Sequence, residues 1–403
     1  MKILIVDGMI PYPPADGGTL RVFNLLQRLS HHHDVSLLVL YNPLVQDESA
    51  AAFLRTCCAH VELVARRERS QRDYRRRLLR GALRGESLRL AAYRSEEMAD
   101  RVRSLTEDES FDIMDVQRPW MAPYVEAISP ASRCRKILTL YDVPYVQYRR
   151  MMWAERDRRT KLRLFYMDWL FSKRTTLKYA RRFDKCVLVS ALDCDVLRRA
   201  GPDLDIAVVP NGVDIGNYSP LAGPPMTPTL LFVGKMNYVP NVDGAVFFCR
   251  EIFPLIKRQV PDAKLLIVGQ KPDRSVQALA SDDVTVTGYV ESVIPYYQQS
   301  LVSVVPLRAG GGTRLKILES MALGRPVIST PLGCEGLAVT PDEDILVADT
   351  PADFAAQTVR LLRDGELRRR LIINGRRLVE TTYDWEAIAQ QLLQVYGEAM
   401  SSR

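Results

Sequence analysis

The stretch from residue 302 to residue 333, VSVVPLRAGGGTRLKILESMALGRPVISTPLG, constrains the fold of this chain more than any other. It begins with an apolar run at 302–305, which is typical of a buried strand, and continues through three consecutive glycines. Apolar residues at helical spacing follow from Leu315 and stop at Gly324, and a second apolar run starts at Val327. This order predicts a strand, a glycine loop, a helix and a second strand, which together form a βαβ unit of a parallel sheet.

The charge pattern of this unit predicts an anion at the start of its helix. Free backbone N–H groups and the helix dipole make a helix N-terminus suited to anions. Arg314 and Lys316 lie in the predicted first turn, although cations oppose the dipole there. We therefore expect an external anion beside the glycine loop, with phosphate as the first choice.

The length of the chain predicts two domains, because 403 residues exceed what one hydrophobic core usually holds. Apolar residues at 47% and charged residues at 26% are ordinary for a soluble globular protein. No apolar run reaches the roughly 18 residues of a membrane-spanning helix. The opening residues, MKILIVDGMI, have the pattern of a first strand and not of a signal peptide.

The cysteines predict a reducing compartment. The seven cysteines are scattered, odd in number and free of CxxC spacing, so neither a disulfide framework nor a zinc site is expected. We therefore expect a cytoplasmic protein that binds no metal.

Two motifs resemble metal sites and are better explained without a metal. His31, His32 and His33 are consecutive, so they cannot all face one ion, and a solvated turn is expected. Asp193 and Asp195 form a DxD motif, but they follow Ser190 at the spacing of a helix N-cap with acidic residues in the first turn. Capping is the preferred interpretation.

The net charge of +7 is concentrated in two segments. Segment 66–103 carries 13 arginines against 6 acidic residues, and segment 149–182 carries 12 basic against 3 acidic residues. Such basic surfaces predict an anionic partner, whether a phospholipid headgroup, a lipid-linked phosphate or nucleic acid, although solvated helix faces have the same composition. Aromatic residues among the arginines of 149–182 suit either a membrane interface or a helix packed by one face. No aromatic-interleaved readout motif is present, so nucleic acid is not expected.

The first half of the chain predicts a doubly wound sheet that begins strand, loop, helix, strand. Gly17 and Gly18 follow the first strand, and Thr19 is the expected cap of the next helix. Asp142 and Gln117 follow later strands in the same way, at the strand ends where open α/β sheets bind ligands. Strands are expected at 2–7, 34–40, 61–64, 113–116, 137–140, 186–190 and 207–209.

The second half restarts the alternation after a proline-rich passage, which predicts a linker at 215–228 between two domains. The first domain would span 1–214 and the second 229–384, with a final helix at 385–403. Strands are expected at 229–233, 264–268, 284–287, 302–305, 327–330 and 345–347, and a helix at 241–257. The predicted fold class is α/β, with two Rossmann-like doubly wound domains that face a central cleft.

Seven motifs in sequence order resemble glycosyltransferase family 4, the retaining sugar transferases of GT-B fold, and in particular members that act on exopolysaccharide or cell-envelope glycans. The resemblance runs almost from end to end. The motifs are Gly17-Gly18 with Arg21, PNGVD at 210–214, VGK at 233–235, VG at 268–269, TGYV at 287–290, LESMALGRPV at 318–327 and YDW at 383–385.

The resemblance implies a nucleotide-sugar donor on the second domain and an acceptor on the first. Glu319 matches the second glutamate of the family's Glu-x7-Glu motif, which binds the ribose hydroxyls. Lys235 matches the cation that neutralises the donor diphosphate, and Tyr289-Val290 lie where backbone contacts hold the base. Gly17-Gly18 would let backbone approach the diphosphate or the donor sugar. The donor side would also include Gly234, Gly269, Gly310, Gly311, Gly312 and Thr313, and the final helix would cross back to the first domain.

Three positions depart from the family pattern. Gly311 stands where the family places its first glutamate, against the donor sugar. Pro240-Asn241 occupies the region where a second phosphate-binding lysine is expected, and we hypothesise that Arg314 and Lys316 supply the missing charge. The family's histidine near the anomeric centre has no histidine counterpart, and Asp142 and Gln117 are the nearest candidates.

The resemblance implies a hexosyltransferase that retains the anomeric configuration and needs neither cofactor nor metal. Lys235, Arg314 and Lys316 would stabilise the departing diphosphate. The acceptor would be a glycan or a lipid-linked glycan, met at the inner face of the cell membrane if the basic segments bind anionic lipid. A nucleotide-sugar epimerase or phosphorylase is an alternative, although no pyridoxal-binding lysine is identified and cleft carboxylates are few. Gly311 motivates another alternative, a non-catalytic nucleotide-sugar-binding protein.

Overall fold

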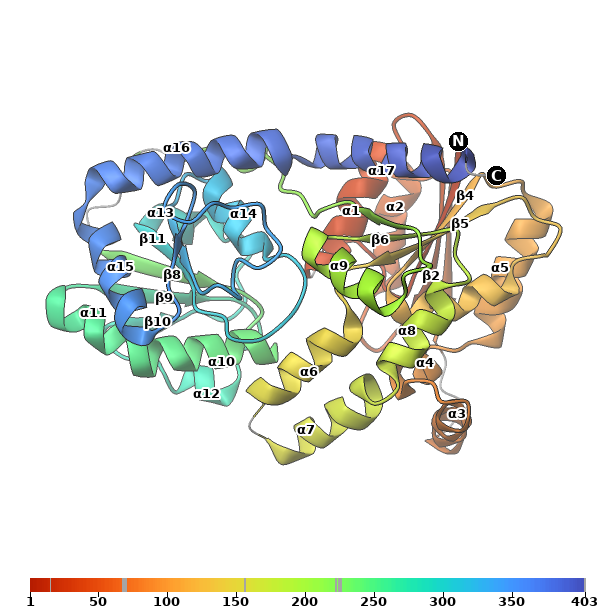
Figure 1. Cartoon of the computed structure of the whole chain (residues 1–403), viewed down its shortest axis with the longest axis horizontal. Coiled ribbons are helices and arrows are strands. Elements are labelled where there is room, and N and C mark those ends of the chain that lie inside the picture. Colours follow the sequence, from red (N-terminus) through yellow and green to blue (C-terminus); the bar gives the residue numbers. More distant parts are fainter. Residues whose placement is uncertain (15, 67–70, 156, 222, 224–226, 402–403) are drawn as a thin grey trace. The chain divides into compact units, whose positions relative to one another are not determined.

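The computed structural model describes residues 1–14, 16–66, 71–155, 157–221, 223 and 227–401, and these form two compact units (Figure 1). Unit 1 contains Met1–Arg149, Arg158–Pro210 and Trp385–Arg403, and unit 2 contains Arg150–Asp157 and Asn211–Asp384. The predicted linker includes residues 222 and 224–226, which lie outside the described residues. Each unit is an α/β fold on a parallel sheet. The prediction of two Rossmann-like domains is therefore confirmed.

Unit 1 is built on a seven-stranded parallel sheet with the strand order β3-β2-β1-β4-β5-β6-β7. The order reverses between β1 and β4, and this reversal places a switch point beside the end of β1. Every strand predicted for this part of the chain is present. The strands are β1 (Lys2–Asp7), β2 (Asp34–Tyr41), β3 (His60–Ala65), β4 (Ile113–Gln117), β5 (Arg135–Leu140), β6 (Lys185–Leu188) and β7 (Ile206–Val208).

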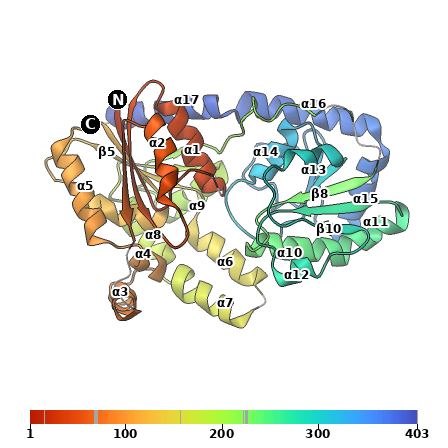
Figure 2. The same ribbon diagram turned by 180° about the vertical axis from the view of Figure 1, so that it is seen from behind.

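Helices cover both faces of this sheet because its strands alternate buried side chains between two cores. Ile3 and Ile5 of β1 join one core, with α1, α2 and α17, and Figure 2 shows α1 and α2 over that face. Leu4 and Val6 join the other core, with α4, α5, η2, α8 and α9. The helical elements of unit 1 are α1 (Gly17–Leu29), η1 (Glu48–Ala50), α2 (Ala51–Cys57), α3 (Gln71–Leu83), α4 (Leu88–Ala92), α5 (Glu96–Asp108), η2 (Pro119–Ala127), α6 (Pro144–Ala154, which runs into unit 2), α7 (Arg158–Arg163), η3 (Leu164–Trp169), α8 (Ser172–Ala180), α9 (Ala191–Ala200) and α17 (Trp385–Ser401).

Helix α1 begins earlier than the sequence suggested. Its N-cap is Asp16, whose carboxylate accepts a hydrogen bond from the Thr19 backbone N–H at 3.0 Å, and the Thr19 hydroxyl accepts one from the Asp16 N–H at 2.9 Å. The prediction of Thr19 as the cap was therefore wrong, because Thr19 is the third helical residue of a capping box. Gly17 and Gly18 consequently form the first turn of the helix and not a separate turn before it.

The C-terminal helix α17 belongs to unit 1, whereas the preceding α16 (Gly365–Thr382) belongs to unit 2. The crossing helix implied by the family resemblance is thus present. Trp385, Ile388 and Leu392 bury themselves in the core that β1 shares with α1. The Tyr396 hydroxyl donates a hydrogen bond of 2.6 Å to the buried Asp115 carboxylate of β4. Burial raises the pKa of Asp115 to about 6.

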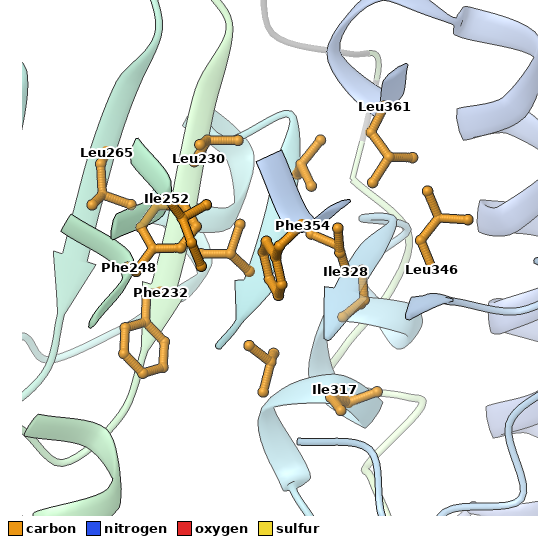
Figure 3. Packing of buried hydrophobic residues seen from close by; sticks show 14 of the residues in the cluster. Leu230, Phe232, Phe248, Ile252, Leu265, Ile317, Ile328, Leu346, Phe354 and Leu361 are labelled. Atoms are coloured by element: carbon orange, nitrogen blue, oxygen red, sulfur yellow. The ribbon is translucent and has the colours of Figure 1, made fainter. Parts of the chain in front are cut away.

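Unit 2 is built on a six-stranded parallel sheet with the order β10-β9-β8-β11-β12-β13. Figure 3 shows its core, in which Phe232 and Leu230 of β8 and Ile328 of β12 pack with Phe248 and Phe354 from the helices. The strands are β8 (Thr229–Val233), β9 (Lys264–Val268), β10 (Val284–Val286), β11 (Val302–Val305), β12 (Val327–Ser329) and β13 (Leu346–Val347), and the helices beside α16 are α10 (Val239–Phe247), η4 (Phe248–Ile252), α11 (Phe253–Gln259), α12 (Arg274–Gln277), α13 (Ile294–Gln299), α14 (Leu315–Ala322) and α15 (Pro351–Arg363).

The helical stretch predicted at 241–257 is present and contains a π-helical turn. A π-helical turn, η4, joins α10 to α11. Pro254 follows the turn within the first residues of α11 and lacks the N–H that a continuous α-helix would direct to Arg250. The predicted helical stretch is thus confirmed, with a local departure from α-helical geometry before this proline.

The described residues contain no helix with the length and apolar character needed to cross a membrane. The two basic segments fold mostly into helices. Segment 66–103 contains α3, α4 and the first part of α5, and segment 149–182 contains the end of α6, α7, η3 and α8. Residues 67–70 and 156 of these segments lie outside the described part of the chain.

Candidate functional site

The carboxyl ends of β8 and β9 in unit 2 are held in close contact by two glycines. Gly269 has a φ of +153°, and a Cβ atom there would lie 1.7 Å from the Gly234 carbonyl oxygen. No residue with a side chain fits this approach. The two strand ends therefore form a tight backbone floor immediately before Lys235.

Lys316 of α14 reaches this floor. Its Nζ donates a hydrogen bond of 2.8 Å to the Asn241 Oδ1, and the Asn241 Nδ2 donates one of 3.0 Å to the Lys235 carbonyl. A Cβ at Gly234 would lie 2.8 Å from the Lys316 Nζ, so this glycine too makes room for the ammonium group. Lys316 also lies over the Phe232 ring, 4.5 Å from its centroid.

Asn241 is the residue of this site that sequence reasoning missed. It appeared only as the place where a second lysine was absent. The structure shows it 6% exposed and bonded to both Lys235 and Lys316. The signal available in the sequence was a polar side chain in the first turn of a helix that opens at a strand end, six residues after Lys235.

Glu319 lies one helical turn beyond Lys316 in α14 and is half-buried. Burial raises the pKa of the Glu319 carboxyl to about 7 and lowers the pKa of the Lys316 ammonium to about 7. Attraction between the two opposes both shifts, and Arg314 adds to the lowering of the Lys316 pKa. The Glu319 carboxylate also raises the pKa of Tyr218. Both members of the pair can therefore change protonation near neutral pH.

Two charged groups of this site make no direct bond to the described part of the protein. The Glu319 carboxylate makes no hydrogen bond or ion pair with a described residue, and the same holds for the Lys235 ammonium. A buried or half-buried charge without a partner is costly in a folded protein. An acceptor and a cation thus remain available to a ligand at the carboxyl edge of the sheet.

The glycine loop after β11 is organised by Arg314. The Arg314 Nη1 donates hydrogen bonds to the carbonyls of Gly311 and Gly312, and Gly310 and Gly312 have φ values of +108° and +67°. The Thr313 hydroxyl accepts a hydrogen bond of 2.7 Å from Asn211. Arg314 is 8% exposed, so much of its guanidinium serves the loop itself.

The residues expected beside the base lie at the end of β10. Gly288 has a φ of +77°, and the Tyr289 side chain is 77% exposed. Val290 is half-buried and packs against the small core that contains Tyr297 and Leu323. Backbone groups and an open aromatic ring are therefore presented together at this strand end.

Unit 1 has its own polar group of residues at the carboxyl ends of β1, β4 and β5. A Cβ at Gly18 would lie 2.8 Å from the Tyr141 ring and 3.0 Å from the Arg118 Nη1, and the Tyr141 hydroxyl donates a hydrogen bond of 2.9 Å to Gln117. Gly17 is exposed, and Asp142 follows Tyr141 and is half-buried. The structure brings Gly18 and Gln117 to one strand edge, with Asp142 next in sequence to a member of the group.

Arg118 is the residue of this edge that sequence reasoning missed. It has a φ of +76°, is 5% exposed, and donates a hydrogen bond of 2.7 Å from Nε to the Asp7 carboxylate. Burial raises the pKa of Asp7, and Arg118 opposes that shift. A non-glycine residue with positive φ at the end of a strand is strained. No sequence pattern predicts a positive φ at an arginine.

Of the two motifs that resemble metal sites, the DxD motif lies at a helix cap and the histidine run lies partly exposed in a turn. Ser190 is the N-cap of α9 and accepts a hydrogen bond of 3.1 Å from the Asp193 N–H, as predicted, while Asp195 pairs with Arg198 at 2.9 Å. His31 and His32 are exposed. Among the described residues, no group of three or more His, Cys, Asp or Glu could hold a metal ion, and all seven cysteines are free.

Two family models match the chain. The model described as Glycosyltransferase Family 4 matches residues 15–217, which is half of the chain, and the model described as Glycosyl transferases group 1 matches residues 227–364. The two matches cover the principal part of unit 1 and the sheet of unit 2.

Similar proteins have been found by sequence. An uncharacterized 44.6 kDa protein in the cps region of Klebsiella pneumoniae is 22% identical over 95% of this chain and 96% of its own length. A phosphatidyl-myo-inositol mannosyltransferase of Mycobacterium leprae is 27% identical over 49% of this chain and 55% of its own length. The chain thus matches about half of that mannosyltransferase.

Solved structures share the fold. A sucrose-phosphate synthase from Thermosynechococcus elongatus aligns over 100% of both chains with a TM-score of 0.73 at 19% identity. Anabaena Alr3699/HepE in complex with UDP-glucose aligns over 99% of this chain and 100% of its own, with a TM-score of 0.67 at 15% identity. At these identities the likeness concerns the fold, which is that of the GT-B glycosyltransferases.

Proposed function

The chain belongs to glycosyltransferase family 4, and on this premise we propose that it transfers a hexose from a nucleotide-diphosphate sugar to a glycan or lipid-linked acceptor, with retention at the anomeric carbon. The observation that carries the proposal is the pair of charged groups Glu319 and Lys235 in unit 2. Neither Glu319 nor Lys235 makes a hydrogen bond or ion pair with a described residue, and Asn241 bonds the Lys316 ammonium that attracts Glu319. A nucleoside diphosphate offers the matching chemistry, a diol and two phosphates.

Each group of the site has a defined part in this proposal. The Glu319 carboxylate accepts hydrogen bonds from the two ribose hydroxyls, because its two oxygens match a vicinal diol. Lys235 and Lys316 neutralise the diphosphate as it departs. Backbone at Tyr289-Val290 holds the base. Arg314 fixes the glycine loop through the carbonyls of Gly311 and Gly312 and adds positive charge near the donor.

Unit 1 supplies the reacting side of the proposal. Gly17 and Gly18 let the backbone of α1 approach the donor sugar or the diphosphate. Asp142 is the proposed polar side chain near the anomeric centre. The retained configuration is proposed from the family resemblance and not from any one of these residues.

The proposed reaction needs no metal, because Lys235 and Lys316 supply cationic charge to the leaving group. Transfer should continue unchanged after treatment with a chelator. Complete loss of activity with a chelator, and its return with manganese, would contradict this part of the proposal.

A thermal-shift titration tests donor binding directly. The protein is titrated with UDP-, GDP-, ADP- and TDP-sugars, and one of these should raise the melting temperature with concentration, because a ligand of the folded state stabilises it. Glu319→Gln should lose most of that shift, whereas Glu343→Gln on the exposed surface of unit 2 should keep it. If none of the four nucleotide sugars stabilises the wild-type protein, the proposal fails.

The acceptor is proposed to be a cell-envelope glycan. The phosphatidyl-myo-inositol mannosyltransferase supports a lipid-linked acceptor, since its name contains a phospholipid. Transfer of radiolabelled sugar into the glycan or lipid fraction of a membrane extract would support it. Label found in neither fraction, despite donor turnover, would argue for a small soluble acceptor.

We also propose that the basic helices of unit 1 contact an anionic membrane surface. Leu79 and Leu83 of α3 are 62% and 81% exposed, and Leu162 and Tyr166 of the α7–η3 region are 47% and 53% exposed. Both views place α3 and α7 along one edge of unit 1 (Figures 1 and 2). Exposed apolar side chains among arginines are typical of interfacial helices. Vesicle flotation should recover the protein with anionic and not with neutral lipid, and binding to neither would end the idea.

A non-catalytic nucleotide-sugar-binding protein is the second candidate, because Gly311 replaces a glutamate of the family motif. The two candidates differ in turnover. An enzyme releases nucleoside diphosphate from the nucleotide sugar that raises its melting temperature, whereas a binding protein leaves that nucleotide sugar intact.

A further inference from the structure

A small cavity of about 20 Å³ lies in unit 1 between α4, η2, α6, η3 and α8, away from the strand ends described above. Its lining includes Arg89 of α4, Trp120 of η2, Tyr148 of α6, Asp168 of η3 and Thr176 of α8. These elements come from three separate parts of the sequence. No role in donor binding involves any of them.

A fixed ion pair forms one wall of the cavity. The Arg89 Nε donates to the Asp168 Oδ1, and the Arg89 Nη2 donates to the Asp168 Oδ2 at 3.2 Å. Asp168 is 2% exposed and lies in the π-helical η3. The Arg89 side chain is 36% exposed, and such a partly exposed ion pair is weak support for stability, whereas π-helical turns often occur at functional sites. The pair therefore suggests a purpose beyond folding.

Aromatic rings hold the guanidinium in place. The Arg89 Cζ lies 5.4 Å from the centroid of the Trp120 ring and 5.5 Å from that of Tyr148. The Arg89 Nη1 makes no hydrogen bond to a described residue, so it keeps two donors while the rest of the group is immobilised. A donor held in this way loses little entropy when a ligand binds.

The cavity is polar without a net charge. Arg89 and Asp168 are the charged residues of its lining and cancel each other, and the remaining polar groups are hydroxyls and the indole N–H of Trp120. The Thr175 hydroxyl accepts a hydrogen bond of 3.3 Å from the Ser87 N–H, and the Thr176 hydroxyl has no hydrogen-bond partner among the described residues. Such a lining complements a neutral hydroxyl, which both donates and accepts, better than a phosphate or carboxylate.

The cavity lies close to the reacting edge of unit 1. Trp120 is the link, because the Arg118 Cζ also lies over its ring, 5.7 Å from the centroid. Arg118 in turn lies beside Gly18 of α1. A group anchored in the cavity would thus be one aromatic side chain away from the strand ends where the donor sugar is proposed to react.

We infer that this cavity is an acceptor subsite that anchors one hydroxyl or hydroxymethyl group of a neutral sugar unit. Its volume admits about one water-sized group, so the sugar ring itself would lie at the mouth, against the half-buried Trp120. The Arg89 Nη1 would donate to the anchored oxygen, and Thr176 would accept from it. This inference rests on the proposed transferase function and adds the acceptor chemistry to it.

Saturation-transfer NMR with methyl glycosides of glucose, galactose, mannose and N-acetylglucosamine tests the subsite. One of these probes should bind the wild-type protein, and Thr176→Val should weaken that binding about 3- to 10-fold, the range of one neutral hydrogen bond. Trp120→Ala should weaken it at least as much, and Trp120→Phe should restore part of the loss. Thr56→Val on α2 is the matched control and should bind as the wild type does.

The outcomes separate the subsite from the donor site. Thr176→Val conserves shape, so its melting temperature and its thermal shift with the nucleotide sugar should equal those of the wild type. The subsite is refuted, while donor binding stands, if no glycoside binds the wild type. The same follows if Thr176→Val and Trp120→Ala bind the glycoside as tightly as the wild type does. Tighter binding of inorganic phosphate or methyl glucuronide than of every neutral glycoside would overturn the neutral-sugar assignment. If no nucleotide sugar stabilises the wild type, the proposed function fails whatever the glycosides do.

Discussion

At the scale of single residues, the pair Lys316 and Glu319 supports the proposal that unit 2 binds a charged ligand. Both groups have a pKa of about 7, displaced by burial in opposite directions from their ordinary values. The charged form of each group therefore lowers the free energy of unfolding, and direct contacts with a bound nucleotide would offset this loss. The pH dependence of stability should reveal this cost.

Replacing Lys316 with methionine should stabilise the unliganded protein at pH 6 and abolish its response to donor. The pKa of Lys316 is lowered from 10.5 to about 7, so the unfolded chain binds more protons between those values. The cost is therefore full below pH 7 and fades toward pH 10.5. The melting temperature of Lys316→Met should exceed that of the wild type by a few degrees at pH 6 and by less at pH 9.

The control for this prediction is Lys264→Met, whose lysine pairs with Asp283 at the surface and should change stability little. Glu319 does not reverse the sign at pH 6, because its pKa of about 7 keeps it largely protonated there. An advantage of Lys316→Met that is absent at pH 6, or that grows toward pH 9, would contradict the assignment of the buried cation.

Replacing Arg314 with alanine should weaken donor binding by about 3- to 10-fold or more, because the glycine loop loses the group that bonds the carbonyls of Gly311 and Gly312. Calorimetric titration with the stabilising nucleotide sugar measures the change. Arg258→Ala, an exposed arginine of α11, should bind normally. An unchanged affinity of Arg314→Ala, within about 0.5 kcal/mol, would remove Arg314 from the site.

The sequence identifies some of these residues and hides others. Glu319 and Lys235 follow from motifs, because each has a fixed place beside a strand end or in a helix. Asn241 was hidden because its contact with Lys316 joins positions 75 residues apart. Arg118 was not predicted because its side-chain position depends on a positive φ. Among residue types, only glycine indicates such a φ from the sequence.

At the scale of elements, hydrophobic periodicity predicts the strands well and the helix ends less well. Each predicted strand is present because a buried parallel strand needs an uninterrupted apolar run. The start of α1 was misplaced because two glycines, poor helix formers, occupy its first turn. The π-helical turn η4 inside the predicted helical stretch was not foreseen, because proline is tolerated in the first turn of a helix and gives no unique signal.

Replacing Asp16 with alanine should lower the stability of the protein by about 1 kcal/mol, because the Thr19 backbone N–H in the first turn of α1 loses its carboxylate acceptor. A denaturant titration measures the change, and Asp16→Asn should retain most of the stability because asparagine caps nearly as well. If Asp16→Ala is as stable as the wild type, the first turn of α1 is not held by this cap. The position of Gly17 and Gly18 in the helix would then have to be reconsidered.

At the scale of the whole molecule, the chain is a family 4 glycosyltransferase with two Rossmann-like units and a C-terminal helix that belongs to the first. This architecture could be predicted because the order β-loop-α-β appears twice and the family motifs occur in sequence. The cavity of unit 1 could not be predicted. It is assembled from α4, η2, α6, η3 and α8, whose contacts no local pattern encodes.

Turnover of the donor in the absence of acceptor tests the central claim most directly. NMR spectroscopy can follow the nucleotide sugar that stabilises the protein and record both nucleoside diphosphate release and the first anomer of the freed sugar. The account predicts slow release with retained configuration, a loss of about 100-fold or more in Lys235→Ala, and normal release in Lys264→Ala. No release from any of the four nucleotide sugars by the wild-type protein, or an inverted first anomer, would contradict it.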